Sequence, residues 1–200
     1  MFDSPTPFNR RKVLGTLGAV SASAIACSSP ASAFFFRRPA SPALHVDDLP
    51  AEWADLQGRN LTNYADYLAN LNLEKVAVQQ VIEAHAKQHG NVWNSLPPQS
   101  LWKNIGITLK VVDRIAREID KPVKEVISVY RSPIYNARCA GAKSSSWHQT
   151  NFAMDVSFPV SSRLITNTVR NYRNRGLFRG GVGGYSNFTH VDTRGMNVDW

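Results

Sequence analysis

The two most informative stretches of the sequence are SWHQTNFAMD, residues 146–155, and THVD, residues 189–192. They contain His148, Asp155 and His190. Two imidazoles and one carboxylate are the ligand set of a catalytic zinc site, which keeps a fourth position open for water. The residue types therefore predict a metal site assembled from two separate segments of the C-terminal half.

Segments with strand character surround these residues. Residues 125–130 are β-branched and apolar, as expected for a buried strand. In the strand predicted for residues 152–158 the side chains alternate, so Asp155 points away from the apolar set. The last predicted strand, residues 188–193, carries His190. Pairing of the strands predicted for residues 152–158 and 188–193 would bring Asp155 and His190 together. The loop before residue 152 would supply the third ligand, His148.

The run GGVGGY, residues 180–185, leads into the last predicted strand and follows a helix predicted for residues 162–175. Glycine-rich loops can bind phosphates, but these glycines do not open a helix, and no Lys-Ser/Thr pair follows them. Glycines before a strand more often allow tight turns or close approach of an extended ligand. The second role suits a peptide lying in a groove.

The first half of the chain is predicted to be helical. Apolar residues recur with helical spacing over residues 61–71, and Asn72 is expected to cap a second helix that ends at Gly90. A third helix is predicted to open at Pro97 and to stop at Lys121.

These elements predict an α+β fold in one domain, residues 61–200. A helical part, residues 61–121, packs on a small, mainly antiparallel sheet that carries the zinc site in a metal-binding part, residues 122–200. Residues 34–60 contain three prolines and are predicted to be a linker or irregular segment.

Residues 1–33 have the features of an export leader. Arg10 and Arg11 precede a small and apolar run, too short for a comfortable membrane span, and small residues suited to cleavage end at Ala33. We therefore predict a twin-arginine signal peptide that engages the twin-arginine export machinery and directs the protein to the periplasm. An uncleaved anchor and a lipid anchor through Cys27 are the alternatives.

The chain is basic, with 23 Lys and Arg against 15 Asp and Glu and a formal net charge of +8. Three of these basic residues and one acidic residue lie before position 34, which leaves +6 for the rest. A basic exported protein is attracted to anionic envelope polymers such as peptidoglycan. Nucleic acid is not an expected partner, because the arginines at 170, 173, 175 and 179 are typical of a solvated helix face. The chain is expected to act as a monomer.

Three other residues with metal-binding or nucleophilic side chains are assigned other roles. His85 and His89 are four residues apart, but Ala86 stands where a zincin motif needs glutamate. The pair is therefore expected to end a helix, where positive charge is favourable. Cys139 would be the only cysteine after cleavage, so no intramolecular disulfide is possible. It is expected to be a small buried residue rather than a ligand or a nucleophile.

Together these motifs resemble those of a known family. The motifs are Ser146-x-His148, Ala153-x-Asp155 and His190-Val191-Asp192. They are similar to the zinc peptidases that include D-Ala-D-Ala carboxypeptidases, phage peptidoglycan endopeptidases and the hedgehog fold. The similarity runs from Val126 to the C-terminus and is closest to twin-arginine-exported murein endopeptidases. It implies a hedgehog-like fold and Zn²⁺ bound by His148, Asp155 and His190.

Two positions depart from the family pattern. Asn151 stands where the family usually has glycine, and asparagine tolerates positive φ best among the other residues. Asn187 stands where many relatives have an acidic general base, and an amide cannot accept a proton. Asp192 is the nearest carboxylate on the His190 face. It is expected either to act as the general base or to orient a ligating imidazole.

The expected function is that of an exported zinc metallopeptidase acting on peptidoglycan stem peptides or cross-links, a murein endopeptidase. Zinc would lower the pKa of a bound water to about 7 and polarise the scissile carbonyl. Arg131 either binds a substrate carboxylate or the oxyanion, or forms a buried ion pair. Trp147 either lines the groove or packs. The alternatives are a D,D-carboxypeptidase and a non-catalytic zinc-containing wall-binding module, which only Asn187 favours.

Overall fold

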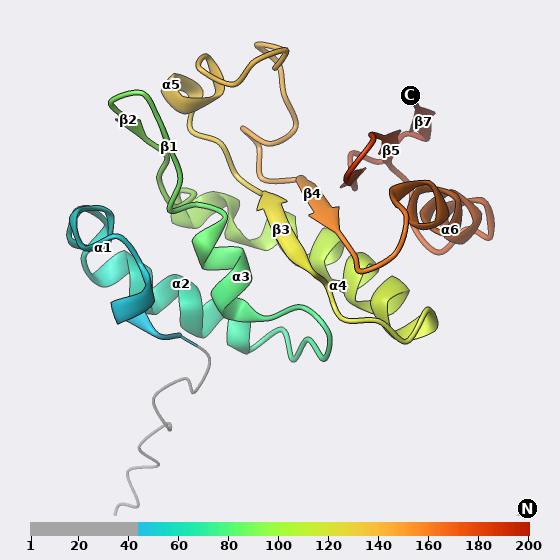
Figure 1. Cartoon of the computed structure of the whole chain (residues 1–200), viewed down its shortest axis with the longest axis horizontal. Coiled ribbons are helices and arrows are strands. Elements are labelled where there is room, and N and C mark those ends of the chain that lie inside the picture. Colours follow the sequence, from blue (N-terminus) through green and yellow to red (C-terminus); the bar gives the residue numbers. More distant parts are fainter. Residues whose placement is uncertain (1–43) are drawn as a thin grey trace, which may run out of the picture. The chain divides into compact units, whose positions relative to one another are not determined.

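The computed structural model describes residues 44–200, so the predicted leader, with Cys27, lies outside the described residues. Helices come first along the chain and the main sheet follows (Figure 1). The first half contains η1 (Val46–Asp48), α1 (Ala51–Gln57), α2 (Arg59–Ala69), α3 (Val78–Glu83), β1 (Gln88–His89), β2 (Val92–Trp93), η2 (Gln99–Leu101) and α4 (Trp102–Glu118). The second half contains β3 (Glu125–Ser128), α5 (Pro133–Asn136), β4 (Ala153–Ser157), α6 (Ser162–Asn174), β5 (Gly181–Gly184), β6 (Thr189–Asp192) and β7 (Val198–Asp199). Within residues 44–200 we find no helix with the length and hydropathy to cross a membrane.

The prediction of an irregular segment up to residue 60 is wrong from Ala51 onward, where α1 begins. Pro50 precedes the helix as its N-cap residue, a position where proline does not interrupt helical hydrogen bonds. Trp53 is completely buried, and its indole N–H donates to the backbone oxygen of Asn94 at 2.7 Å. Helix α1 is therefore part of the core.

The helix predicted from Asn72 to Gly90 is also wrong in extent. Asn72 has a φ of 53° and does not cap a helix; α3 begins six residues later and ends at Glu83. Gly90, with a φ of 60°, lies in the turn of the β1–β2 hairpin. Because His89 lies in β1, the expected pair of helix-end histidines does not form.

His85 is buried without a charge. Its Nδ1–H donates to the Val81 carbonyl oxygen at 2.7 Å, and Tyr64 lies edge-on to the ring with 5.6 Å between centroids. Burial lowers the pKa of His85 to about 4, so the imidazole is neutral at pH 7. It is a core residue and not a cation that complements the helix end.

Helices α4 and α6 pack on the sheet and on one another. The Thr108 hydroxyl of α4 donates to the Phe152 backbone oxygen at 2.8 Å, and the Thr166 hydroxyl of α6 contacts that of Thr189 at 2.9 Å. Thr189 alternates with His190 along β6, so the helices cover the face opposite His190. The other face of β6 is left for the candidate site.

The main sheet has the strand order β3-β4-β6-β5-β7, and every neighbouring pair is antiparallel except β5 and β7. A mixed helix and sheet architecture with a mainly antiparallel main sheet confirms the α+β part of the predicted fold class. In β3 the register shifts between Val126 and Ser128, which places Ser128 opposite Asp155. This irregularity at the edge of the candidate site turns a polar side chain toward it.

The glycine run does not merely approach a strand, because it forms β5 itself. The predicted last strand is followed by β7, which pairs in parallel with β5 and forms the edge of the sheet. A Cβ atom on Gly183 would lie 2.5 Å from the Trp200 indole. The Trp200 side chain therefore lies against the glycine face of β5, where the sequence predicts an extended ligand.

Candidate metal centre

A short loop before β4 presents His148. The loop is closed by hydrogen bonds from the Phe152 N–H to the Trp147 oxygen at 3.1 Å and from the Asn151 N–H to the His148 oxygen at 3.2 Å. Asn151 has a φ of 60°, as expected for a residue standing in for glycine, and its side chain donates to the Leu101 oxygen. The loop therefore keeps its turn and is tied to the start of α4.

The pairing of β4 with β6 places Asp155 directly opposite His190. The His190 Nδ1 lies 2.7 Å from Asp155 Oδ1, and the His148 Nε2 lies 3.2 Å from Asp155 Oδ2. All three side chains are buried. We call His148, Asp155 and His190 the His-Asp-His cluster.

Hydrogen bonds on the far side of each imidazole identify the nitrogen that faces the cluster. The His148 Nδ1–H donates to the Val129 oxygen at 2.5 Å, which leaves the Nε2 lone pair toward Asp155. The His190 Nε2 lies 3.1 Å from Asp192 Oδ2, so a proton on Nε2 leaves Nδ1 free. Both rings can therefore offer a lone pair to the same point.

Burial and the carboxylates act in opposite directions on the protonation of the two histidines. Burial lowers the pKa of His148 and outweighs the opposing effect of Asp155. Burial also disfavours a charged His190, but hydrogen bonds to Asp155 and Asp192 outweigh it and raise its pKa. Burial opposes ionisation of Asp155 as well, yet its imidazole partners hold the pKa of that carboxyl well below its usual range. Asp155 is therefore an anion at neutral pH.

The cluster meets the requirements of a metal site. One ligand atom from each residue lies within 4.8 Å of the others, and no other described residues form such a group. A carboxylate and two imidazoles form a donor set that suits zinc and other transition metals. Cys139 is not part of this group: it is half-buried, its thiol donates to the Tyr135 oxygen, and burial raises its pKa.

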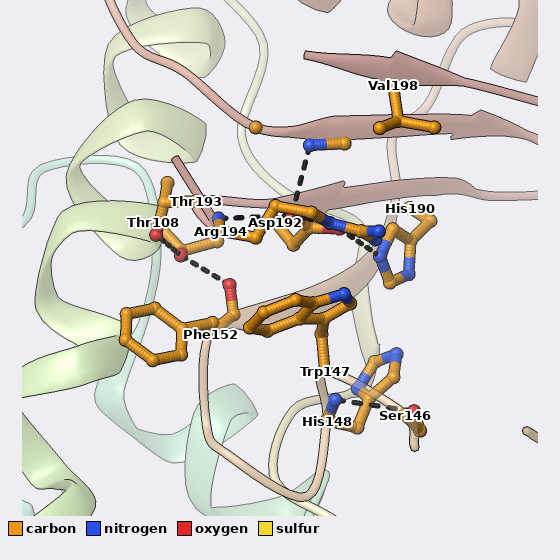
Figure 2. A network of polar contacts seen from close by, with 12 residues as sticks. Thr108, Ser146, Trp147, His148, Phe152, His190, Asp192, Thr193, Arg194 and Val198 are labelled. Carbon is orange, nitrogen blue, oxygen red and sulfur yellow. Dashed lines mark hydrogen bonds and ion pairs between the residues drawn. The ribbon is translucent and has the colours of Figure 1, made fainter. Parts of the chain in front are cut away.

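Asp192 is completely buried and makes several contacts in addition to the one with His190 (Figure 2). It accepts hydrogen bonds from the Gly181 N–H at 3.0 Å and from the Arg194 Nε at 2.7 Å, and its second oxygen binds the other arm of the Arg194 guanidinium. Burial opposes ionisation, but Arg194 and His190 hold the Asp192 pKa well below its usual range. Between the two expected roles, these contacts favour the orienting one.

Arg194 lies between two aromatic rings. Its guanidinium carbon is 5.0 Å from the centroid of Trp147 and 5.4 Å from that of Trp200, and its side chain is 14% exposed. Such cation–π contacts stabilise a guanidinium that is largely removed from water. Trp200 also packs on His190, with 5.0 Å between centroids.

Arg131 forms the ion pair that is one of its two expected roles. Its terminal nitrogen lies 2.6 Å from Asp155 Oδ2, and its Nε donates to the Ser128 hydroxyl at 2.7 Å. The side chain is 17% exposed, so the guanidinium lies at the boundary between the cluster and solvent. Asn187, by contrast, is exposed and contacts the Ser186 hydroxyl.

Three residues around the centre have roles that the sequence pattern does not predict. Arg194 shares the His190 face and Trp200 ends the chain, but neither position indicates a contact with the centre. Arg173 is expected on a solvated helix face, but it is 5% exposed and donates to the Gly180 and Val198 oxygens. The sequence does contain one signal for the position of Trp200. Gly181 and Gly183 lie on the same face of one strand, and glycines there leave room for a bulky side chain to pack.

A buried His-Asp-His cluster on a mainly antiparallel sheet, covered behind by helices, defines a candidate metallohydrolase. The chain belongs to the Peptidase M15 family, whose model matches residues 68–192. The matched segment begins in α2, contains the complete cluster and ends at Asp192, before Arg194 and β7. No curated protein and no solved structure gives a significant match to the chain. Membership in this family supports a peptidase of the D-Ala-D-Ala carboxypeptidase type.

Proposed function

We propose that the protein is a zinc metallopeptidase that hydrolyses peptide bonds in peptidoglycan stem peptides or cross-links, as a murein endopeptidase does. The observation that carries this proposal is the convergence of His148 Nε2, the Asp155 carboxylate and His190 Nδ1 in a member of a peptidase family. These atoms would hold the metal. When bound, zinc supplies Lewis acidity toward the scissile carbonyl and lowers the pKa of a coordinated water.

The residues around the cluster hold its donor atoms in place before a metal or substrate arrives. The Val129 oxygen fixes the tautomer of His148, and Asp192 does the same for His190. Such partners increase the basicity of the ligands and keep the rings from rotating. Asp192 in turn is held by Arg194, so a connected chain of polar contacts extends outward from the centre.

We assign to Arg131 the role of binding negative charge on the substrate. Its guanidinium contacts Asp155, one member of the His-Asp-His cluster, so it would be available to stabilise negative charge on a substrate bound at the cluster. An arginine remains protonated throughout, so it stabilises an oxyanion or binds a substrate carboxylate without a proton transfer. The ion pair with Asp155 holds the side chain in that position.

The protein's setting is also part of the proposal. Arg10 and Arg11, followed by the mild apolar run, support export by the twin-arginine route to the periplasm. Replacing both arginines by lysine should leave the precursor in the cytoplasm, as measured by cell fractionation. Unchanged export of that variant would instead indicate the general secretion route.

The activity can be tested with purified sacculi and the protein lacking residues 1–33, with and without a chelator. We expect soluble fragments whose masses show cleaved peptide bonds, loss of these fragments with the chelator and recovery after zinc is added. Released cross-linked stems would identify an endopeptidase, whereas released single terminal residues would identify a carboxypeptidase. Binding to sacculi without any fragments in the presence of zinc would refute the enzyme and identify a wall-binding module.

A further inference from the structure

A second feature lies beside the metal centre, at the edge of the main sheet. It is a hollow of about 320 Å³ between the start of α6 and the end of β5. Its lining includes Ser162, Arg163, Asn167, Arg170, Tyr185 and Trp200. We call it the α6 hollow. Trp200 also packs on His190, so one side chain lies between this hollow and the His-Asp-His cluster.

Arginine is the charged side chain that lines the α6 hollow. The lining contains two arginines and no aspartate or glutamate. Arg170 is already bound, at 2.9 Å to Asp199 and at 3.1 Å to the Trp200 backbone oxygen. Arg163 is exposed, and within residues 44–200 it has no ion pair or side-chain hydrogen bond. One guanidinium therefore remains available for an anion from outside the chain.

The walls of the α6 hollow are held in fixed positions. The Trp200 indole N–H donates to the Tyr185 hydroxyl at 2.9 Å, and the Ser162 hydroxyl donates to the Tyr185 backbone oxygen at 2.6 Å. Strand β7, which leads to Trp200, is anchored by Arg173 through Asp199 at 2.6 Å. A preformed site loses less conformational entropy when it binds a ligand.

We propose that the α6 hollow is a subsite for a carboxylate of the substrate and that Arg163 is the residue that binds it. The inference rests on the proposed function, because a peptide substrate is what would present a carboxylate beside the scissile bond. A guanidinium binds a carboxylate through two parallel hydrogen bonds. The aromatic side chains Tyr185 and Trp200, 43% and 45% exposed, contact the apolar part of the same substrate residue.

The binding test uses the metal-free protein, so that no cleavage occurs. Three matched peptides are compared. The first carries its one carboxylate on a side chain, the second carries it at the C-terminal end, and the third has amides at both positions. We expect an acidic peptide to shift the NMR signal of the Trp200 indole N–H with a saturable dependence on concentration. The fully amidated peptide should bind on the order of 10-fold more weakly. The better acidic peptide shows whether the carboxylate comes from a side chain or a chain end.

Arg163→Gln should weaken binding of the acidic peptide to the level of the amide and leave binding of the amide unchanged. The matched control is Arg59→Gln, at the start of α2, another exposed arginine without an ion pair in the described part of the chain. It should change nothing. Equal affinity for acidic and amidated peptides, or equal behaviour of the two variants, would overturn the subsite.

The hydrolysis assay keeps this inference separate from the proposed function. With zinc and acidic fragments, Arg163→Gln should raise KM on the order of 10-fold and leave kcat unchanged. Cleavage without preference for the acidic substrate would retain the peptidase and refute the subsite. Carboxylate-dependent binding without cleavage would retain the subsite and refute the peptidase.

Discussion

Asp192→Asn separates the two roles that the sequence leaves open for this carboxylate. The substitution keeps the size of the side chain, but it replaces a buried anion that accepts hydrogen bonds from Gly181, Arg194 and His190. If Asp192 orients His190, the loss should weaken zinc binding by about 10–100-fold, or about 1.4–2.8 kcal/mol. Turnover should return partly when zinc is in excess.

The same substitution should destabilise the metal-free protein. It leaves the Arg194 guanidinium, 14% exposed, without its carboxylate, and breaking a buried ion pair of this kind costs about 3–5 kcal/mol. Urea unfolding measures this loss, and competition with a chromophoric chelator measures zinc affinity. Asp113→Asn is the matched control because Asp113 is 4% exposed and accepts the N–H groups of Glu74 and Lys75 outside the site. It should lower stability and leave zinc affinity unchanged.

If Asp192 has the orienting role, the substitution should lower the affinity for zinc more than it lowers the turnover measured at saturating zinc. A variant with normal zinc affinity and a loss of turnover on the order of 100-fold or more would refute this reasoning and identify Asp192 as the general base. A fully active variant with normal affinity would remove Asp192 from both roles.

Three further substitutions test the structure around the centre. Gly183→Ala places a methyl group 2.5 Å from the Trp200 indole, so it should lower the free energy of unfolding in urea by about 1–3 kcal/mol. The double variant with Trp200→Ala should recover most of that loss. His85→Leu should reduce the loss of stability at acidic pH. As pH falls, the unfolded imidazole takes up a proton near its ordinary pKa of 6.5, but the folded imidazole does so only near 4. The folded protein therefore loses about 3 kcal/mol of stability between these two pH values, and the variant should not. An unchanged difference in stability between pH 7 and pH 4.5 would contradict this. Trp53→Ala should cost about 3–5 kcal/mol, and a cost below about 1 kcal/mol would show that α1 is not part of the core.

Local patterns are sufficient to predict part of the site. The alternation of side chains along β4 and β6 depends only on strand geometry, so the sequence alone assigns Asp155 and His190 each to one face of its own strand. The register that places them opposite one another comes from the pairing of the two strands in the structure. The tolerance of Asn151 for positive φ is also a property of one residue, and its φ of 60° confirms it. The face of a side chain on its strand and the φ that a residue tolerates are local properties, so these two predictions need no distant partner.

The errors arise where partners distant in the sequence decide the local structure. The helix predicted to continue to Gly90 ends at Glu83. Asn94 binds the Tyr130 oxygen and the Ser132 N–H, which holds the β1–β2 hairpin against the segment just after β3. The role of Arg173 depends on Asp199, 26 residues away. Helical periodicity and residue composition contain no information about these partners.

The pairing of Asp155 with His190 also makes metal affinity a measure of correct folding. A slip of one residue between β4 and β6 would turn His190 toward α4 and α6 and bring a neighbouring residue to the centre. Only the native pairing would present both side chains to one ion. A bound ion would therefore favour that pairing over other pairings with a similar hydrophobic pattern. Zinc added during refolding should therefore raise the yield of correctly paired protein, beyond any effect on the stability of the finished fold.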